Sequence, residues 1–461
     1  MSLTQNIKKT INYSRKNGYA ETVLSVWERV TENYSANYTY QPPEEETLQR
    51  QREDHSVSDI QFSILVPAYE TQTAHMEALI DSCMAQTYGN WELIITDGSP
   101  DDCVEEVVRK YQDPRIRYVK LVENGGIAEN TNKAIDLAEG DYYGLLDHDD
   151  LLTPDALYLF AHAIDEKRPI FAYSDEDKCD TSGKRFYDPH FKLDFNLDLF
   201  LTNNYVCHFT VVQAEVMRKY RIRKEYDGSQ DYDLFLRIVA GLLLKERENR
   251  DARPVEDYIL HVPKVLYHWR CHENSTAGNP QSKMYAYEAG KKALTDFAAR
   301  MGWKVDVRHN KHLGFYHIEY RNDLFHHRRD LAAAGGFAVY HGKVASGIYR
   351  GQPLVYAGYM NRMDLYQDVA VLDIRNLAVS KAYQDIYQEV TGHPYESTIL
   401  TENKELPQWL RELDKSAQGR SQIARMSAEL CHRLSAAGGR LLLNPTCVRT
   451  VKGVAAVSDN E

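Results

Sequence analysis

The sequence predicts an α/β protein with a mostly parallel central sheet flanked by helices. Short apolar runs typical of buried strands recur along residues 62–146, and segments with the apolar spacing of amphipathic helices lie between them. Strands that alternate with helices pair in parallel, because each helix returns the chain to the same edge of the sheet. Polar residues follow several of these runs, and α/β proteins bind ligands at the carboxyl ends of parallel strands.

The apolar pattern places the elements in order along the chain. Strands are expected at residues 62–66, 92–96, 116–121 and 142–146. The three-and-four spacing of apolar residues predicts helices over 76–84 and 127–138. Further along, the pattern predicts a polar, loop-rich region at 174–204, a helix at 229–240, a charged insertion at 245–251, a strand at 261–268 and an Ala-rich helix at 284–301.

At 461 residues the chain is long enough for more than one domain. Basic, Tyr-containing segments followed by Pro42-Pro43 and charged residues predict a helical N-terminal extension and polar linker at residues 1–58. The strand and helix pattern predicts a main α/β domain at 59–328. A new unit begins near the small residues at 332–336, which predicts a C-terminal α/β domain at 329–461.

Composition limits the function classes. Hydrophobic residues make up 43% of the chain and charged residues 26%, as in soluble globular proteins. The 67 acidic residues outnumber the 55 basic ones, which argues against nucleic acid as a main partner. The 7 cysteines include no CxxC pair, and this pattern indicates reduced thiols in a cytoplasmic protein. The 32 tyrosines suit surfaces that are both apolar and hydrogen-bonding, such as sugar-binding clefts, although Tyr-rich cores are more common.

No membrane span is predicted, because the chain contains no run of ~18 apolar residues, and its start lacks the apolar core of a signal peptide.

An acidic run follows the fourth predicted strand. Asp147, Asp149 and Asp150 occupy three of the four positions directly after the apolar residues. Carboxylates this close repel one another unless a cation lies between them, and a hard divalent cation carrying a diphosphate fits that need. The alternative is an acidic turn in which Asp149 or Asp150 caps a helix that begins near Pro154.

Two other predicted strands also end in polar residues. Pro67-Ala68-Tyr69-Glu70 follows the first strand, and Asp97-Gly98-Ser99 follows the second. Because parallel strands end at one edge of the sheet, we expect all three polar ends to converge on one cleft.

Taken together, residues 60–275 resemble a family 2 glycosyltransferase with the GT-A fold, the fold that binds nucleotide-diphospho-sugars. The resemblance is distributed over five segments: 62–69, 92–99, 124–134, Asp147-His148-Asp149 and 229–237. Thr96 and Gln230 depart from the family, where Asp and Glu are usual at these positions. Neither departure removes Asp97 or Asp231, so we interpret both as adjustments of specificity or local electrostatics.

The resemblance implies a metal site for Mn²⁺ or Mg²⁺. Asp149, together with Asp147, would hold the cation against the diphosphate of the donor. The resemblance also places His268 as a ligand of the metal or a contact of the diphosphate, with His272 as the competing candidate. The alternative for either histidine is a purely structural role.

The same resemblance implies that Asp231 is the general base that removes a proton from the acceptor hydroxyl. Ser229 is a candidate N-cap of the predicted helix, and the helix dipole would favour an ionised carboxylate in its first turn. The alternative is that Asp231 is an ordinary first-turn acid.

The residues assigned to the donor nucleotide by resemblance are Pro67, Ala68, Tyr69, Asp97, Asn124, Gly126 and Asp147. Asp97 would accept a hydrogen bond from the nucleobase, while Asn124 and Gly126 would let the backbone approach the ribose. Ordinary turns are the alternative for both segments. Lys192 and Arg270 are candidates for phosphate contacts, and residues 174–178 would either line the donor sugar or form an acidic loop.

The C-terminal third is similar to the acceptor-side half of the same fold, with a helix near 430–438 followed by a short strand and Pro445. It carries no second Asp-x-Asp motif, so we expect no second active site. Binding of acceptor glycan, self-association as a homo-oligomer, and a structural cap over the main domain are the three alternatives.

The sequence therefore predicts a metal-dependent, inverting glycosyltransferase. Its partners would be a nucleotide-diphospho-sugar donor and a hydroxyl of a growing surface glycan. A lipid-linked acceptor would bring the protein to the inner face of the plasma membrane, where Lys8, Lys9, Arg15 and Lys16 favour peripheral association. The alternative function is a catalytically idle GT-A-like module that binds sugar nucleotide or glycan for a partner enzyme. A nucleotidyltransferase would instead need a basic, Gly-rich loop at 67–70.

Overall fold

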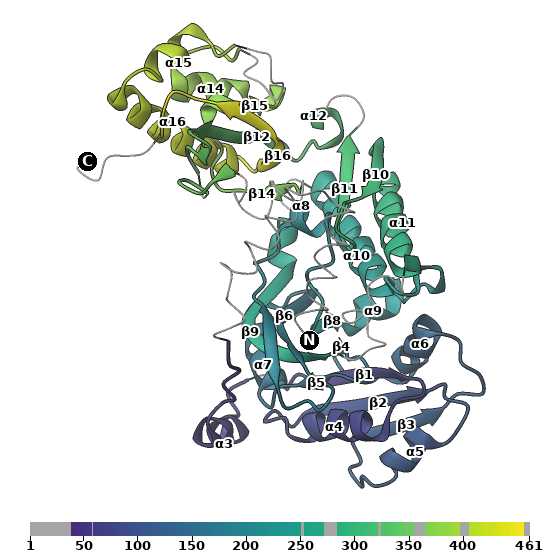
Figure 1. Cartoon of the computed structure of the whole chain (residues 1–461). Coiled ribbons are helices and arrows are strands. Elements are labelled where there is room, and N and C mark those ends of the chain that lie inside the picture. The colour runs from purple at the N-terminus through teal and green to yellow at the C-terminus, as the bar shows by residue number, and fades with distance from the viewer. Residues whose placement is uncertain are drawn as a thin grey trace, which may run out of the picture.

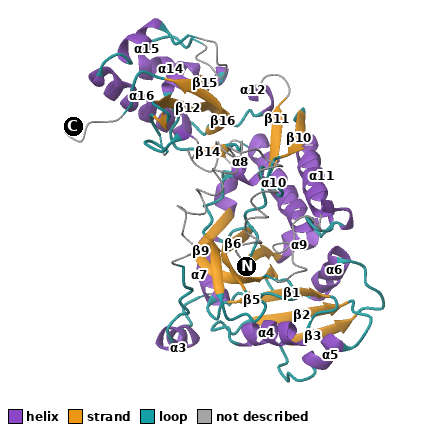
Figure 2. Cartoon of the chain, in the orientation of Figure 1, coloured by secondary structure: helices purple, strands orange, loops and turns teal. Residues whose placement is uncertain are grey.

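The computed structural model describes residues 38–57, 59–249, 253–271, 284–320, 324–347, 349–354, 365–396 and 405–455. Two sheets organise these residues into a main α/β unit and a C-terminal α/β unit (Figure 1). A helical layer and a two-stranded hairpin lie between them (Figure 2). None of the helices in the described ranges is both long enough and apolar enough to cross a membrane.

The first half of the main sheet consists of four parallel strands in the order β3-β2-β1-β4. They are β1 (Phe62–Ala68), β2 (Trp91–Asp97), β3 (Ile116–Lys120) and β4 (Tyr142–Leu145). The helices between them are α4 (Thr73–Met84), α5 (Cys103–Val108) and α6 (Ile127–Leu137). Parallel strands covered on both faces need apolar side chains on both sides, which explains the continuous apolar runs of β1 and β2.

Mixed strands continue the main sheet beyond β4 in the order β8-β6-β9-β5, with β7 beside β6. They are β5 (Leu151–Leu152), β6 (Phe171–Cys179), β7 (Phe186–His190), β8 (Thr210–Gln213) and β9 (Ile259–Arg270). In this half only β6 and β9 pair in parallel, and the remaining pairs are antiparallel. The α/β class predicted from the sequence is confirmed, with the parallel order concentrated in the first half of the sheet.

Helices on one face of the sheet carry the chain toward the C-terminal unit. They include α8 (Leu197–Phe200), α9 (Ala214–Tyr220), α10 (Gln230–Glu248) and α11 (Met284–Arg300), whereas α7 (Ala156–Lys167) packs with α4 on the opposite face. The hairpin of β10 (Val305–His309) and β11 (Tyr316–Tyr320) follows α11. One core contains Leu65 and Ile94 of the sheet, Phe235 of α10 and Leu294 of α11, so that these helices are fixed to the sheet by apolar packing.

Several local expectations were wrong. Residues 174–178 form the interior of strand β6 instead of a loop, because their polar side chains find partners on distant segments. The charged segment from Lys245 to Glu248 continues helix α10, and the expected linker contains helix α3 (Glu45–Glu53). Helix α7 has Asp155 at its N-cap position, which excludes Asp149 and Asp150 as its cap. Residues 1–37 lie outside the described ranges.

The C-terminal unit has a five-stranded sheet in the order β13-β12-β16-β14, with β15 beside β12. The strands are β12 (Leu331–Tyr340), β13 (Lys343–Val344), β14 (Gln367–Asp368), β15 (Leu377–Val379) and β16 (Arg440–Thr450). Its helices are α14 (Gln384–Thr391), α15 (Gln408–Leu413) and α16 (Ala417–Ala436). The parallel pair β12 and β16 forms its centre, and β16 runs on through Pro445 as a longer strand than expected.

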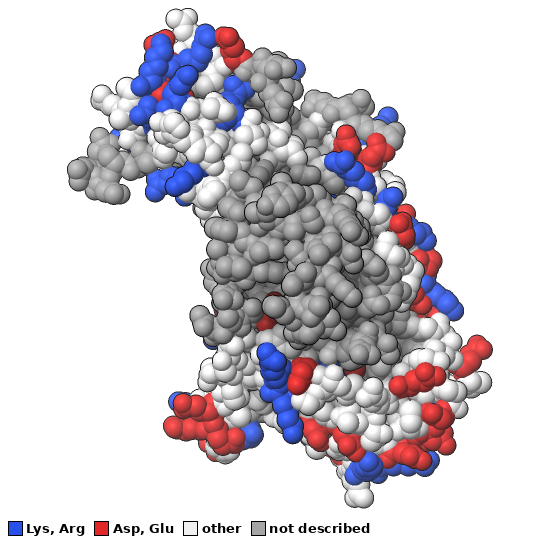
Figure 3. Space-filling view, viewed as in Figure 1, with Lys and Arg blue, Asp and Glu red and all other residues white. Residues whose placement is uncertain are grey.

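Ion pairs join the two units, and the pair of Arg328 with Asp198 is buried. Arg328 donates hydrogen bonds to Asp198 of α8, with Nη2 2.9 Å from Oδ2, and also to Asp330. Arg440 of β16 donates to Glu256 at 3.0 Å. On the face shown in Figure 3, Lys and Arg side chains gather over the C-terminal unit, whereas Asp and Glu gather around α3 and along the lower edge of the main unit. Charge is therefore distributed unevenly on this face.

Candidate active site

A cleft of about 940 Å³ opens at the carboxyl ends of β1 and β4. Its lining brings together most of the predicted site residues: Pro67, Tyr69, Asn124, Gly126, Asp147, Asp149 and Asp231. These residues come from two strand ends, the loop before α6 and the first turn of α10, which lie far apart in the sequence. The convergence of the polar strand ends follows from the parallel order of β1 and β4.

The acidic run forms one wall of the cleft. Asp147 is 43% exposed there, and desolvation within the cleft raises its pKa. His208 partly offsets this rise, and the neighbouring carboxylate of Asp149 adds to it. The His148 ring between the two aspartates is fixed by a 2.7 Å hydrogen bond between its Nδ1 and Thr71 Oγ1. The two carboxylates thus share one wall of the cleft, and within the described ranges no arginine or lysine forms an ion pair with Asp147.

Asp150 has a different role from its neighbours. Its carboxylate is completely buried and accepts hydrogen bonds from the Tyr267 hydroxyl at 2.5 Å and from the backbone N–H of Arg270 at 2.6 Å. Arg270 in turn donates from Nε to the carbonyl oxygen of Asp149 at 2.5 Å. Asp150 and Arg270 therefore tie the acidic run to β9 and leave Asp147 and Asp149 at the cleft.

Asp231 lies in the first turn of α10 and lines the same cleft. Asn204 Nδ2 donates to its Oδ2 at 3.0 Å, and the Cys207 thiol donates to the same oxygen at 2.9 Å. The backbone N–H of Tyr232 donates to Oδ1 at 2.7 Å. Ser229 occupies the N-cap position, but its hydroxyl donates to the carbonyl of Ala286 instead of capping the helix. Asp231 is held by neutral donors on both oxygens.

His208, which the sequence did not predict as a site residue, also lines the cleft. Its Nε2 lies 3.9 Å from Asp147 Oδ2, and its ring stacks on Tyr267 with centroids 5.0 Å apart. Burial alone would lower the pKa of His208, but the carboxylates of Glu176 and Asp147 raise it to about 9. This raised pKa favours the protonated form of the imidazole beside the acidic run.

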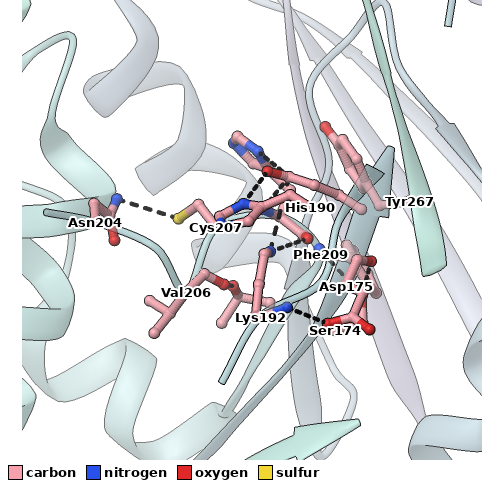
Figure 4. A network of polar contacts seen from close by, with 12 residues as sticks. Ser174, Asp175, His190, Lys192, Asn204, Val206, Cys207, Phe209 and Tyr267 are labelled. Atoms are coloured by element: carbon pink, nitrogen blue, oxygen red, sulfur yellow. Dashed lines mark hydrogen bonds and ion pairs between the residues drawn. The ribbon is translucent and has the colours of Figure 1, made fainter. Parts of the chain in front are cut away.

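A buried network below the cleft supports His208. Glu176 Oε2 accepts the backbone N–H of His208 at 2.6 Å, and Lys192 Nζ donates to the carbonyl oxygen of His208 at 2.6 Å. Burial alone would raise the pKa of Glu176, yet Lys192 and hydrogen bonds with His190 and His208 bring it well below its usual range. Figure 4 shows Lys192 beneath the segment that carries Cys207 and Phe209. Lys192 thus braces the wall from inside the protein.

Three predicted residues, Ala68, Asp97 and His268, lie outside the cleft lining. Ala68 is fully buried. Asp97 is also buried, and its oxygens accept hydrogen bonds from Tyr118, Lys120 and the backbone of Ser99 at 2.8 to 3.1 Å.

His268 lies on the opposite face of β9 from Trp269, which does line the cleft. Its Nδ1 pairs with Asp177 Oδ1 at 2.5 Å, and its ring packs against Tyr40 and Phe186. The alternation of side chains along a strand explains this placement. The competing candidate, His272, lies outside the described residues.

The donor set at the acidic run fits a hard divalent cation. Asp147 and Asp149 offer carboxylate oxygens, which are the ligands that Mg²⁺ and Mn²⁺ prefer. A second group, Cys207, His208 and Asp231, has ligand atoms within 4.8 Å of one another. Burial raises the pKa of Cys207 well above its usual range, so its sulfur remains a protonated donor to Asp231. The oxygen pair is therefore the better match for the predicted metal.

Residues 63–221 match the family described as Glycosyl transferase family 2. This part of the chain is a family 2 glycosyltransferase domain, and its main sheet with flanking helices is the GT-A fold that the motifs implied. The matched residues include Asp97, Asp147 and Asp149, and they end before Asp231.

Similar proteins cover only parts of the chain. It is 41% identical over 244 residues to uncharacterized protein y4gI of Sinorhizobium fredii, which covers 52% of this chain and 25% of that protein. It is 30% identical over 251 residues to the O-antigen biosynthesis protein RfbC of Myxococcus xanthus, and the match covers 53% of this chain and 18% of that protein. Chondroitin synthase of Pasteurella multocida is 29% identical over 183 residues, and the match covers 38% of this chain and 18% of that protein. The chain spans a quarter or less of the length of these relatives.

Among solved structures, S. aureus TarS 1–349 in complex with UDP-GlcNAc has 17% sequence identity and a TM-score of 0.39, over 52% of this chain and 66% of that one.

Proposed function

We propose that this chain, with its family 2 glycosyltransferase domain, transfers a sugar from a nucleotide-diphospho-sugar to a hydroxyl of a glycan acceptor in surface polysaccharide synthesis. The observation that carries the proposal is that Asp147, Asp149 and Asp231 line one cleft of about 940 Å³. The similarity to RfbC, an O-antigen biosynthesis protein, supports the pathway class. Ligand pockets of this size accommodate a sugar nucleotide.

The acidic run would serve the leaving diphosphate. Bound Mn²⁺ or Mg²⁺ would neutralise the negative charge of that group as the bond to the sugar breaks. Asp147 and Asp149 would hold the cation, and the protonated ring of His208, 3.9 Å from Asp147, would add positive charge on the same side. Tyr69, Asn124 and Gly126 line the adjoining part of the cleft, where the nucleoside would bind.

Asp231 would act on the acceptor. Its carboxylate would take the proton of the attacking hydroxyl, while Asn204 and Cys207 hold Oδ2 in place. A direct attack with one base, in which the diphosphate leaves from the opposite face of the sugar, inverts the configuration at the anomeric carbon. Anomeric proton couplings in the first product formed would reveal the stereochemistry, and a retained configuration would overturn this assignment.

The donor class can be identified by thermal unfolding with a panel of nucleoside diphosphates, each with and without Mn²⁺. A ligand that binds only the folded protein stabilises it by about 2.7 kcal/mol at 100 times its Kd. We expect a metal-dependent rise in Tm for one base, and loss of that metal dependence in Asp149→Asn. The absence of a shift with every nucleotide would overturn the proposed function.

We also propose a cytoplasmic location, with a lipid-linked acceptor at the inner face of the plasma membrane. The support is the basic sequence around Lys8, Lys9, Arg15 and Lys16, which lies outside the described residues. Flotation with vesicles containing anionic lipid tests it, and the double variant Lys8→Glu/Lys9→Glu should bind less. Equal absence of binding in both proteins would reject the membrane contact.

A further inference from the structure

The cleft has an aromatic wall beside Asp231. Tyr285 and Tyr287 from the start of α11, and Phe315 and Tyr316 from the entry to β11, all line it. Figure 1 shows α11 and the β10–β11 hairpin next to α10. These elements follow residue 221, so they lie beyond the part of the chain that matches the family. The wall thus lies outside the residues that match the family.

Tyr285 is the most exposed ring of the wall. It is 58% exposed, although most large rings in the described ranges are buried or half-buried. A Cβ atom at Gly228 would lie 2.7 Å from Tyr285 Cε2, so the absence of a side chain at Gly228 makes room for the ring. Gly228 has φ +93°, a left-handed conformation that favours glycine, and Asp231 follows three residues later. The ring therefore lies against the turn that leads into the base-bearing helix.

The rest of the wall is held rigidly. The Tyr316 hydroxyl donates to the carbonyl oxygen of Tyr287 at 3.0 Å. The Tyr316 ring stacks on Tyr232, the neighbour of Asp231, with centroids 6.2 Å apart and an interplanar angle of 23°. A side chain at Gly290 of α11 would overlap the Tyr316 hydroxyl, which explains the glycine there. Tyr285 is thus an exposed ring on a fixed support.

A pyranose ring matches this surface chemically. One face of a hexopyranose presents C–H groups, whereas its edge carries hydroxyls. An exposed tyrosine ring offers an apolar face with a polar tip. The donor nucleoside is expected near Tyr69 and Asn124, whereas the Tyr285 ring packs at Gly228, three residues before Asp231. A ring that lies beside the predicted base is placed for the acceptor.

We propose that Tyr285, supported by Tyr287 and Tyr316, forms an acceptor subsite that stacks the terminal pyranose ring of the glycan and presents its hydroxyl to Asp231. This inference rests on the proposed function. It commits the acceptor to a sugar whose C–H face lies on the Tyr285 ring, and it makes Tyr285 a specificity-determining residue.

Saturation-transfer NMR with methyl glycosides and disaccharides of glucose, galactose and N-acetylglucosamine tests the subsite on the full chain. We expect signal from the C–H protons of at least one sugar, reduced at least five-fold in Tyr285→Ser and retained in Tyr285→Phe. Met284→Ser is the matched control, because Met284 is 44% exposed at the same helix start and is not among the cleft-lining residues. Tyr69→Ser should instead weaken the binding of the nucleoside diphosphate.

The outcomes separate the two proposals. If Tyr285→Ser binds sugars as the unmodified protein does, or if the unmodified protein gives no signal with any sugar, the subsite is overturned. The proposed function still stands in that case, provided that a nucleoside diphosphate raises Tm with Mn²⁺. If no nucleotide raises Tm, the proposed function fails independently of the sugar result. Once an acceptor is known, Tyr285→Ser should raise its KM about ten-fold with little change in kcat or in the KM of the donor.

Discussion

Two aspartates, one in each α/β unit, are held in opposite ways. In the main unit, Asp231 is held by the Asn204 amide, the Cys207 thiol and a backbone N–H, all of which are neutral. In the C-terminal unit, Asp373 is held by a guanidinium, with Arg375 Nη2 2.7 Å from Oδ2. Arg375 also donates to Asp414 at 2.7 Å. Burial alone would raise the pKa of Asp373, but Arg375 brings it below its usual range.

The difference indicates where chemistry is to be expected. A buried carboxylate that is paired with arginine is neutralised and serves the structure. Carboxylates that face a cleft with neutral donors, or with each other, keep their charge available for a cation or a proton. The raised pKa of Asp147 and the lowered pKa of Asp373 show these two situations in one chain. The contrast identifies Asp147 as a candidate for chemistry and Asp373 as a structural carboxylate.

The strongest test of the contrast is Asp231→Asn. The amide keeps an oxygen that accepts from Asn204 or Cys207, but it cannot take a proton. We expect sugar transfer to fall about 10²- to 10⁴-fold, the usual contribution of a general base, while Tm stays close to that of the unmodified protein. Glu225→Gln, a change at an exposed carboxylate, is the control. An unchanged rate of sugar transfer in Asp231→Asn would contradict the assignment of Asp231 as the general base.

The complementary change is Arg375→Met in the C-terminal unit. It leaves Asp373 and Asp414 buried without their cation, which costs about 3–5 kcal/mol of unfolding free energy. Urea unfolding measures the loss. The variant that also carries Asp373→Asn and Asp414→Asn should recover most of the stability, because it removes the unpaired charges. A loss below about 1 kcal/mol in the single variant would contradict the structural role.

The main unit was largely predictable because its first half is locally encoded. Strands β1, β2 and β4 are buried in a parallel sheet, so each is a continuous apolar run, and their predicted bounds lie within two residues of the observed ones. Strand β6 was missed because its interior, from Ser174 to Lys178, is polar. Its carboxylates contact Lys192, His261 and His268, which the local sequence does not reveal.

The site residues also divide into those marked by a local motif and those placed by distant contacts. The acidic run and the Asp231 helix were recognisable as motifs, and the structure places both at the cleft, although their chemical roles remain proposals. His208 and Cys207 lie in an irregular segment before β8, with no pattern that marks them. Tyr285 lies on an ordinary amphipathic helix, and only packing against Gly228 brings its ring to the cleft. Residues that depend on tertiary contacts are the ones that sequence reasoning missed.

The pairing of Asp373 also predicts a pH dependence. Its pKa in the folded protein lies below the usual value of 3.8. The pair therefore stabilises the fold fully above pH 3.8, and this stabilisation is lost as the pH falls through the lower, folded pKa. Urea midpoints of the unmodified protein and Asp373→Asn should differ most at neutral pH and converge in acid. A difference that grows toward low pH would reverse the assigned sign.

The smallest expected effect concerns the neutral donors of the cleft. Cys207→Ala removes one hydrogen bond to Asp231 Oδ2 but leaves the bond from Asn204. Because a single neutral hydrogen bond is worth about 1 kcal/mol, we expect kcat to fall about five-fold with the donor KM unchanged. Cys207→Ser keeps a donor and should retain most of the rate, and Cys103→Ala, a thiol outside the cleft lining, should have no effect. If Cys207→Ala and Cys207→Ser behave alike, the thiol fills space and does not position the base.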